Sequence, residues 1–154
     1  MSDTIAEVRR VHQVFENPEP STPCLPGLNP FVKNKLELAA CFLRALSKEF
    51  LAMAGGSVVA LRTSLELEEL SEVLDATASG DLVQVLWEKA DQRVVNDGTL
   101  LAYGLAPAFP EAFRRIIESQ FSKLDEHGKP IKVNGRFIKG PNYRKPDLSD
   151  LIPK

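Results

Sequence analysis

The sequence is poor in the residues on which several protein classes depend. Its 154 residues include two cysteines, two histidines and one tryptophan, and no apolar run approaches the roughly 20 residues that span a bilayer. Cys24 and Cys41 are too few for a disulfide framework. His12 and His127 leave little material for a histidine-based triad or a zinc site. Residues 1–10 mix both charges and lack the apolar stretch of a signal peptide, so we expect a cytoplasmic protein without a membrane partner.

Charge is placed unevenly along the chain, although the formal net charge is only −2. Residues 66–97 hold nine acidic residues against two basic ones, whereas residues 122–154 hold eight basic residues against four acidic ones. A polyphosphate site built around a divalent metal would use both regions, with carboxylates for the metal and cations for the phosphates. Solvated helix faces would give the same pattern, so charge alone leaves both interpretations open. The small net charge argues against general affinity for nucleic acids or anionic membranes.

Hydrophobic periodicity predicts an all-α protein, a bundle of about five helices. Apolar residues recur at helical spacing in five stretches, and Gly55-Gly56 and Ser79-Gly80 supply breaks between them. Asp81 is a good N-cap for the fourth helix, and Thr63-x-x-Glu66 could be a capping box for a late start of the third. The predicted helices cover residues 5–15, 35–53, a stretch after Gly56 that ends near 78, 82–105 and 110–121.

We expect residues 1–154 to form a single domain with three parts. Residues 1–34 are an N-terminal helix and a proline-rich, irregular connection, and residues 35–121 are the helical core. Residues 122–154 are a basic, mostly irregular tail, in which Asn134-Gly135 predicts a small hairpin. Such a tail has little core of its own, so it would fold over the bundle or a ligand, or stay partly disordered. Apolar faces on four helices predict a homodimer or a larger homo-oligomer.

Acidic residues of the third and fourth helices fall on matching faces. Glu72 and Glu88 each lie eight residues from the break at Gly80. Glu69 and Asp91 each lie eleven residues from it, so in an antiparallel helix pair both pairs stand at equal heights. Like charges at such close range are costly unless a cation neutralises them, and hard oxygen ligands suit Mg²⁺ or Mn²⁺. The predicted metal ligands are Glu68, Glu69, Glu72, Glu88 and Asp91.

Each of these acids taken singly would be an ordinary solvated helix residue, and only the matched spacing favours a site. Glu68 and Glu69 are adjacent and cannot both point the same way without help, so one of them could orient a water as general base. Asp97 lies six residues past Asp91, about 120° off that face of the helix. We therefore do not expect Asp97 among the ligands.

These residues resemble a known family. Glu68-Glu69-x-x-Glu72 followed by Glu88-x-x-Asp91 is similar to the EExxE…ExxD signature of the all-α nucleoside triphosphate pyrophosphohydrolases, a superfamily that includes MazG, phosphoribosyl-ATP pyrophosphohydrolase and dimeric dUTPase. Gly98-Thr99 looks like part of the glycine-marked end of the metal helix in the MazG-like branch. Residues 122–130 and 139–148 look like the C-terminal blocks of MazG-like, phosphoribosyl-ATP-pyrophosphohydrolase-like proteins, so the resemblance covers roughly residues 61–152.

The resemblance implies a Mg²⁺-dependent enzyme, with Mn²⁺ as a substitute, that cleaves nucleoside triphosphates to a monophosphate and pyrophosphate. It implies that the five acids hold the metal and that Glu68 or Glu69 activates water. By family analogy, dUTP is the first candidate substrate, in a house-cleaning role for nucleotide pools. The alternatives are a phosphoribosyl-ATP pyrophosphohydrolase of histidine biosynthesis and a non-catalytic helical interaction module. The candidate substrate-binding residues are Lys123, Lys139, Asn142, Tyr143 and Arg144.

Overall fold

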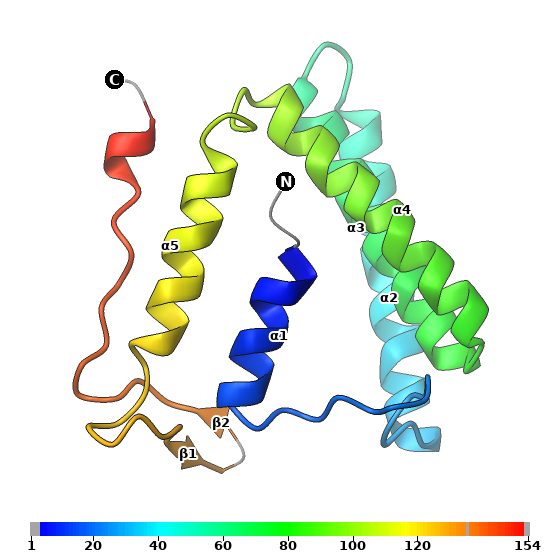
Figure 1. Ribbon diagram of the computed structural model, residues 1–154. Helices are drawn as coiled ribbons and strands as arrows, with labels where there is room; N and C mark the ends of the chain where they lie inside the picture. Colours follow the sequence, from blue (N-terminus) through cyan, green and yellow to red (C-terminus); the bar gives the residue numbers. More distant parts are fainter. Residues whose placement is uncertain (1–3, 135, 153–154) are drawn as a thin grey trace. The chain divides into compact units, whose positions relative to one another are not determined.

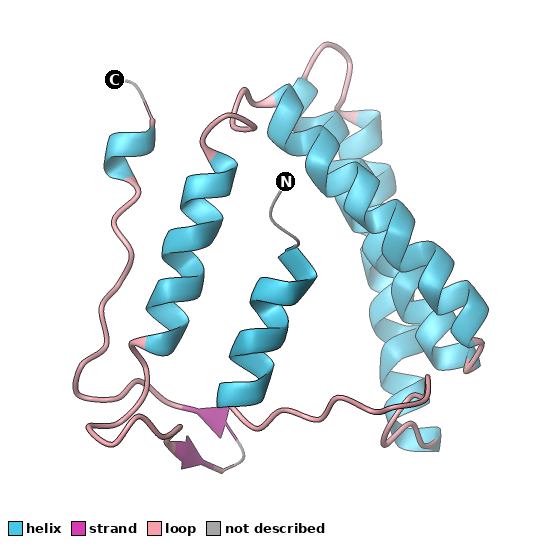
Figure 2. Cartoon of the chain, in the orientation of Figure 1, coloured by secondary structure: helices cyan, strands magenta, loops and turns pink. Residues whose placement is uncertain are grey.

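The computed structural model describes residues 4–134 and 136–152, and its regular structure is mainly helical (Figures 1 and 2). The described residues form five α-helices, one two-stranded hairpin and a short 3-10 helix, which confirms the predicted all-α class. No helix among them is both long and apolar enough to cross a membrane. The elements are α1 (Thr4–Val14), α2 (Pro30–Ala52), α3 (Val58–Ser79), α4 (Leu82–Ala102), α5 (Phe109–Phe121), β1 (Lys132–Val133), β2 (Arg136–Phe137) and η1 (Ser149–Leu151).

Contacts along the chain group it into two compact units. The three-helix unit, residues 22–106, contains α2, α3 and α4. The terminal unit, residues 1–21 and 107–154, contains α1, α5, the hairpin and the tail. The sequence places the fifth helix within the helical core of residues 35–121. The contacts group it instead with the two ends of the chain.

The second helix begins earlier than the apolar periodicity indicates. It starts at Pro30 and not near Lys35, because Asn29 caps it: the Asn29 side chain accepts a hydrogen bond from the Val32 N–H at 3.0 Å. Proline suits the first turn of a helix, since it lacks only an N–H that would have no intrahelical partner. The irregular proline-rich connection thus ends at Asn29.

The break between α3 and α4 lies where the sequence places it. Gly80 ends α3 in the left-handed conformation with φ 85°, and the Asp81 carboxylate accepts two backbone N–H groups of the first turn of α4. The start of α3 differs from the prediction. Ser57 caps it by accepting from the Ala60 N–H, so Thr63 lies inside the helix and the predicted capping box is wrong.

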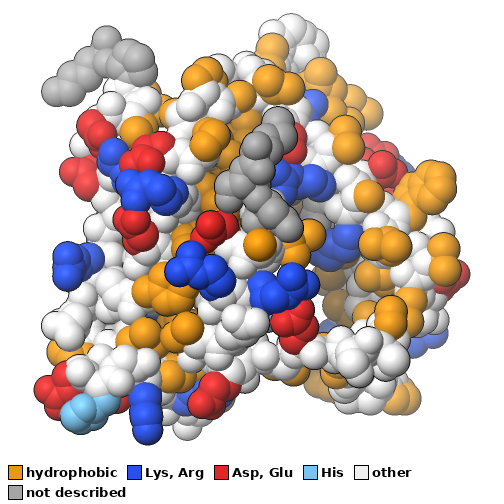
Figure 3. Space-filling model, viewed as in Figure 1, with side chains coloured by type: hydrophobic (Ala, Val, Ile, Leu, Met, Phe, Trp, Pro, Cys, Tyr) orange, Lys and Arg blue, Asp and Glu red, His pale blue; other side chains and the backbone are white. Residues whose placement is uncertain are grey.

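Small residues form the seam between α2 and α3. Ser47 and Ser64 are buried, and each hydroxyl donates to the other residue's carbonyl oxygen at 2.9 Å. Ala40 and Ser71 are completely buried. Because small side chains let the helices approach closely, much of the larger apolar surface stays outside the seam. In the space-filling view, hydrophobic side chains are visible over the surface of the three-helix unit (Figure 3).

Arg62, which precedes the acidic residues of α3, connects α3 to α4. Its Nε donates to the Thr99 hydroxyl at 3.1 Å, and its Nη2 donates to the Val95 carbonyl. A Cβ on Gly98 would lie only 2.9 Å from that Nη2. Gly98, which the sequence marks as unusual within a helix, therefore leaves room for the arginine that joins the two helices.

Aromatic and tail contacts organise the terminal unit. Phe15, at the end of α1, is buried and meets Phe137 of the hairpin edge-on, with ring centres 4.9 Å apart. Strand β1 pairs with β2 antiparallel, which confirms the predicted hairpin. The following segment packs closely: the Gly140 N–H donates to the Lys123 carbonyl at 2.8 Å, and a Cβ there would lie 2.3 Å from the Leu124 carbonyl oxygen. The tail thus folds back on the residues that follow α5.

Candidate metal centre

Three carboxylates of the three-helix unit converge. One oxygen each from Glu69 on α3 and from Glu88 and Asp91 on α4 lies within 4.8 Å of the others. Glu88 is buried, Glu69 is half-buried and Asp91 is exposed, so the group extends from the helix interface to the surface. The turn at Gly80 explains the convergence, because residues at equal distances from a tight turn meet in an antiparallel helix pair.

Glu68 and Glu72 are exposed and lie at the edge of this group. Partial burial raises the pKa of Glu72, and the charges of Glu88 and Glu68 add to that rise. Burial likewise raises the pKa of Glu69, followed by repulsion from Glu72, Asp91 and the two other acids. All five predicted ligands therefore lie close enough to repel one another. The carboxylate oxygens of three of them, Glu69, Glu88 and Asp91, converge.

The donor set fits a hard divalent cation. Glu69 Oε2 is buried and accepts no hydrogen bond from any described residue. A buried carboxylate oxygen without a donor is costly, and a cation shared with Glu88 and Asp91 would remove that cost. Carboxylate oxygens are the ligands that Mg²⁺ and Mn²⁺ prefer.

Two further side chains, which the sequence analysis did not single out, orient the acids of α4. The Trp87 indole N–H donates to Asp91 Oδ2 at 2.9 Å, and the Gln84 amide donates to Glu88 Oε1. Both donors precede their acceptors by four residues, so i,i+4 spacing was the signal that could have identified them. Such outer partners hold ligand carboxylates in one orientation.

Arg44 is the third residue that sequence reasoning missed. It reaches from α2 to pair with Asp75 of α3. Arg44, Trp87 and Glu72 line a cavity of about 390 Å³ that also borders Glu88 and Asp91. No sequence signal could have found Arg44, because its place depends on how α2 packs against α3.

Asp97 lies outside the carboxylate group. Its carboxylate accepts a hydrogen bond from Arg93 Nε at 2.9 Å on the same helix. This is an ordinary i,i+4 ion pair on an exposed helix surface. The helical angle between Asp97 and Asp91 had predicted this separation.

The predicted substrate-binding residues lie in the terminal unit. Lys139 Nζ sits 4.3 Å from the centre of the Tyr143 ring, and Lys123 Nζ donates to Gln120 Oε1 at 2.6 Å. Among the described residues, no carboxylate lies within ion-pairing distance of either lysine. The bond from the Gly140 N–H to the Lys123 carbonyl brings the two lysine segments together. These two cations therefore keep their charge unneutralised.

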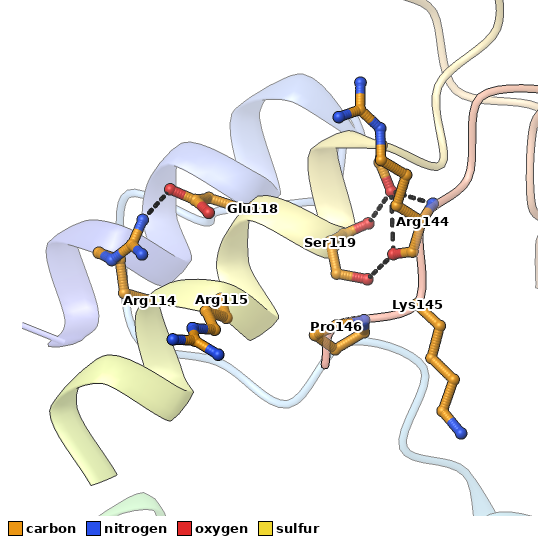
Figure 4. A pocket seen from close by; sticks show the side chains of 8 residues that line it. Arg114, Arg115, Glu118, Ser119, Arg144, Lys145 and Pro146 are labelled. Atoms are coloured by element: carbon orange, nitrogen blue, oxygen red, sulfur yellow. Dashed lines mark hydrogen bonds and ion pairs between the residues drawn. The ribbon is translucent and has the colours of Figure 1, made fainter. Parts of the chain in front are cut away.

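Arg144 is held mainly through its backbone. Its N–H donates to the Ser122 hydroxyl at 2.9 Å, and its carbonyl accepts from the Ser119 hydroxyl at 2.8 Å. Figure 4 shows the side chains of Arg144 and Lys145 extending away from each other. Asn142 is exposed in the turn just before Tyr143. The structure thus places the tail candidates in one unit and the five acids in the other.

A second cavity, of about 580 Å³, lies between α5 and residues 144–146 (Figure 4). Its α5 arginines are already neutralised. Arg114 bonds Glu111 and Glu118, and Arg115 bonds Glu111 and Asp150. The guanidinium groups of these two arginines are therefore occupied, whereas Arg144 and Lys145, which line the same cavity, form no ion pair with any described residue.

Comparison of the chain with protein-family models, with curated proteins and with solved structures found no match. The likeness of the acidic motif and the tail blocks to the MazG-like pyrophosphohydrolases therefore remains a prediction that rests on the residues themselves.

Proposed function

We propose that the chain is a cytoplasmic, metal-dependent nucleotide pyrophosphohydrolase. It would hydrolyse ribo- or deoxynucleoside triphosphates to the monophosphate and pyrophosphate, with dUTP as the first substrate to test. The observation that carries the proposal is the buried, unpartnered Glu69 Oε2 beside Glu88 and Asp91. A bound cation would remove the cost of keeping that oxygen buried without a hydrogen-bond donor.

Each acid has a distinct part in the proposed mechanism. Glu69, Glu88 and Asp91 would hold Mg²⁺ or Mn²⁺, and Glu72 would add charge at the rim. When bound there, the metal would supply positive charge that neutralises the triphosphate and acidifies the attacking water. Glu68, which is exposed beside the group, or Glu69 itself accepts the proton of that water. The water attacks the α-phosphorus, the bond to the bridging oxygen breaks, and pyrophosphate leaves.

The tail contributes substrate contacts in this proposal. Lys123, Lys139 and Arg144 neutralise phosphate oxygens, and Asn142 and Tyr143 contact the base or sugar. The absence of a carboxylate partner for Lys123 and Lys139 among the described residues supports this role.

A homo-oligomer, most simply a dimer, is also part of the proposal. Large apolar side chains on α2 and α4 are well exposed: Phe42 by 67% and Leu86 by 73%. Contact with a second copy would bury them, and the tail of one copy could close over the site of the other. Light scattering at micromolar concentration should give at least twice the mass of the 17.0 kDa chain. A compact monomer would contradict this part.

Pyrophosphate release from a panel of NTPs and dNTPs tests the activity directly. Wild-type protein with Mg²⁺ or Mn²⁺ should turn over at least one of them, and a chelator should abolish turnover. Glu69→Gln keeps the size of the side chain but removes its charge, and it should lower kcat/KM by about 100-fold or more. Glu66→Gln, on the same helix outside the group, is the matched control and should stay active.

If the panel is inert, phosphoribosyl-ATP is the next substrate to test. Turnover of that compound alone would assign the protein to histidine biosynthesis. If phosphoribosyl-ATP is inert as well, the proposal fails, and the carboxylates are the structural cation site of a non-catalytic module.

A further inference from the structure

Trp87 is placed unusually for a tryptophan. It is the only tryptophan of the chain, it directly precedes Glu88 on α4, and it is 64% exposed. Tryptophan is on average one of the more buried residue types, because exposing its large ring to water is costly. Its indole N–H donates to Asp91 Oδ2. The ring surface itself is left without an assigned role.

The ring borders a cavity of suitable size. The cavity of about 390 Å³ is lined by Trp87 together with Arg44, Gln84 and three of the acids, Glu72, Glu88 and Asp91. Pockets for small molecules fall in the range of about 300–1,000 Å³. A ligand held at the carboxylates would therefore extend directly past the indole.

The polar groups of this cavity are already engaged. Arg44 pairs with Asp75, and the Gln84 amide donates to Glu88. With these groups engaged, the cavity is poor in free donors that could read the edge of a base. Its distinctive free surface is the aromatic ring, and stacking on a ring discriminates only weakly among bases.

We propose that Trp87 is the stacking platform for the nucleobase of the substrate, and that it selects a planar base over a base-free polyphosphate without strongly selecting among bases. This inference rests on the proposed function, because the triphosphate must be held at the neighbouring carboxylates. The hydrogen bond to Asp91 fixes the ring beside the metal ligands. A bound nucleotide would cover the ring and remove its exposure to water.

The single tryptophan makes the proposal directly measurable. Fluorescence excited at a wavelength that tyrosine does not absorb reports only Trp87, so the chain can be followed in the presence of Mg²⁺ without any label. One titration uses nucleotides with a nonhydrolysable α,β-imido linkage, and the matched titration uses inorganic tripolyphosphate, which lacks a base. The proposal predicts strong saturable quenching by all the nucleotides and little quenching by tripolyphosphate.

Variant kinetics separate stacking from a merely structural role. Trp87→Leu and Trp87→Phe both lose the N–H that donates to Asp91, so any fall in kcat should be shared by the two variants. The KM of Trp87→Leu should be about 5- to 150-fold above that of Trp87→Phe, because a lost base–aromatic stack costs that factor. Trp87→Phe keeps a ring but loses the N–H, so its KM should stay near that of the wild type. Lys89→Ala is the control, since Lys89 is exposed on the same helix and does not line the cavity.

The outcomes distinguish this inference from the function on which it rests. Metal-dependent turnover with equal quenching by tripolyphosphate overturns the stacking role alone. Turnover with the same KM in Trp87→Leu and Trp87→Phe also overturns it, in favour of a residue that only positions Asp91. A variant that loses its oligomeric state while KM is unchanged places Trp87 in an interface instead.

Base-dependent quenching without turnover supports the stacking site and overturns the proposed hydrolase activity. The absence of both quenching and turnover overturns both proposals.

Discussion

The carboxylate group of the three-helix unit and the acids of the terminal unit are in opposite electrostatic situations. In the three-helix unit, partial burial and repulsion from neighbouring carboxylates raise the pKa of Glu69 and Glu72. In the terminal unit, hydrogen bonds from Arg114 and Arg115 lower the pKa of Glu111 to about 2. Hydrogen bonds from backbone or arginine N–H groups likewise lower the pKa of the terminal unit's aspartates Asp125, Asp147 and Asp150.

This difference separates acids that stabilise the fold from acids that serve a ligand. A carboxylate with matched donors is satisfied by the protein itself, as Asp150 is by Arg115. A carboxylate surrounded by other carboxylates destabilises the folded chain until a cation arrives. On this reasoning the terminal unit uses its acids for structure, and the three-helix unit holds Glu69, Glu88 and Asp91 for metal.

Removing an arginine that donates to the acids of the terminal unit should have the largest effect on stability. Arg115 donates to both carboxylate oxygens of Asp150, at 2.5 and 2.8 Å, and to the Asp147 carbonyl at 2.7 Å. Arg115→Met removes these bonds together and leaves their acceptors unpaired, so it should lower Tm by several degrees. Hydrogen exchange should become faster in residues 144–151.

Arg114→Met is the matched control for that experiment. Arg114 is the next residue on α5 and is also ion-paired, but only to Glu111 and Glu118 within its own helix. Such exposed pairs contribute little, so Tm and the exchange of the tail should barely change. Equal effects of the two substitutions would show that Arg115 does not hold the tail.

Acid titration should act on the two units in opposite directions. The folded-state pKa of Glu111, about 2, lies below its ordinary value of 4.5, so its contribution to stability is complete above pH 4.5 and is lost as pH falls toward 2. The pKa values of Glu69 and Glu72 lie above 4.5 in the folded state. Their contribution is therefore present below pH 4.5 and is lost as pH rises through the raised values.

Hydrogen exchange of the metal-free protein can follow both effects at once. After correction for the intrinsic pH dependence of exchange, protection in α3 and α4 should decrease from pH 4.5 to 7, while protection in α5 and the tail should decrease below pH 4.5. A change of the same sign in both units would remove the electrostatic contrast on which the comparison depends.

Removing one charge from the carboxylate group should have the smallest effect on stability. Unlike most substitutions, it should stabilise the metal-free protein. In metal-free protein at pH 7, Glu69→Gln removes repulsion and should raise Tm, by an amount on the order of 2 °C. With Mg²⁺ the order should reverse, because the wild type gains stability from the bound ion and the variant does not. A variant that is less stable than the wild type without metal would indicate that Glu69 has a structural role.

Sequence patterns predicted the parts of this molecule that depend on local rules. Asp81 and Gly80 mark a helix break that any antiparallel pair needs, and counting outward from it brings Glu69 opposite Asp91. The start of α2 was missed because Asn29-Pro30 was grouped with the irregular prolines, although asparagine followed by proline is also a good helix start.

Features that depend on packing could not be predicted from the sequence. Arg44 reaches the acidic cavity because α2 lies against α3, and Arg62 bonds Val95 where Gly98 leaves room for its guanidinium group. The grouping of α5 with α1 and the tail also depends on contacts between residues far apart in the chain. Trp87 could have been found, since its spacing to Asp91 is that of a helical neighbour.

Direct measurement of divalent-metal binding is the most immediate test of the central claim. Mn²⁺ titration followed by electron paramagnetic resonance, without nucleotide, reports occupancy of the carboxylate group independently of turnover. Wild-type protein and Glu66→Gln should bind Mn²⁺ with the same affinity, and Glu69→Gln should bind it at least about 10- to 100-fold more weakly. Mn²⁺ binding of equal affinity in all three proteins, or no binding in the wild type, would contradict a metal centre at Glu69, Glu88 and Asp91.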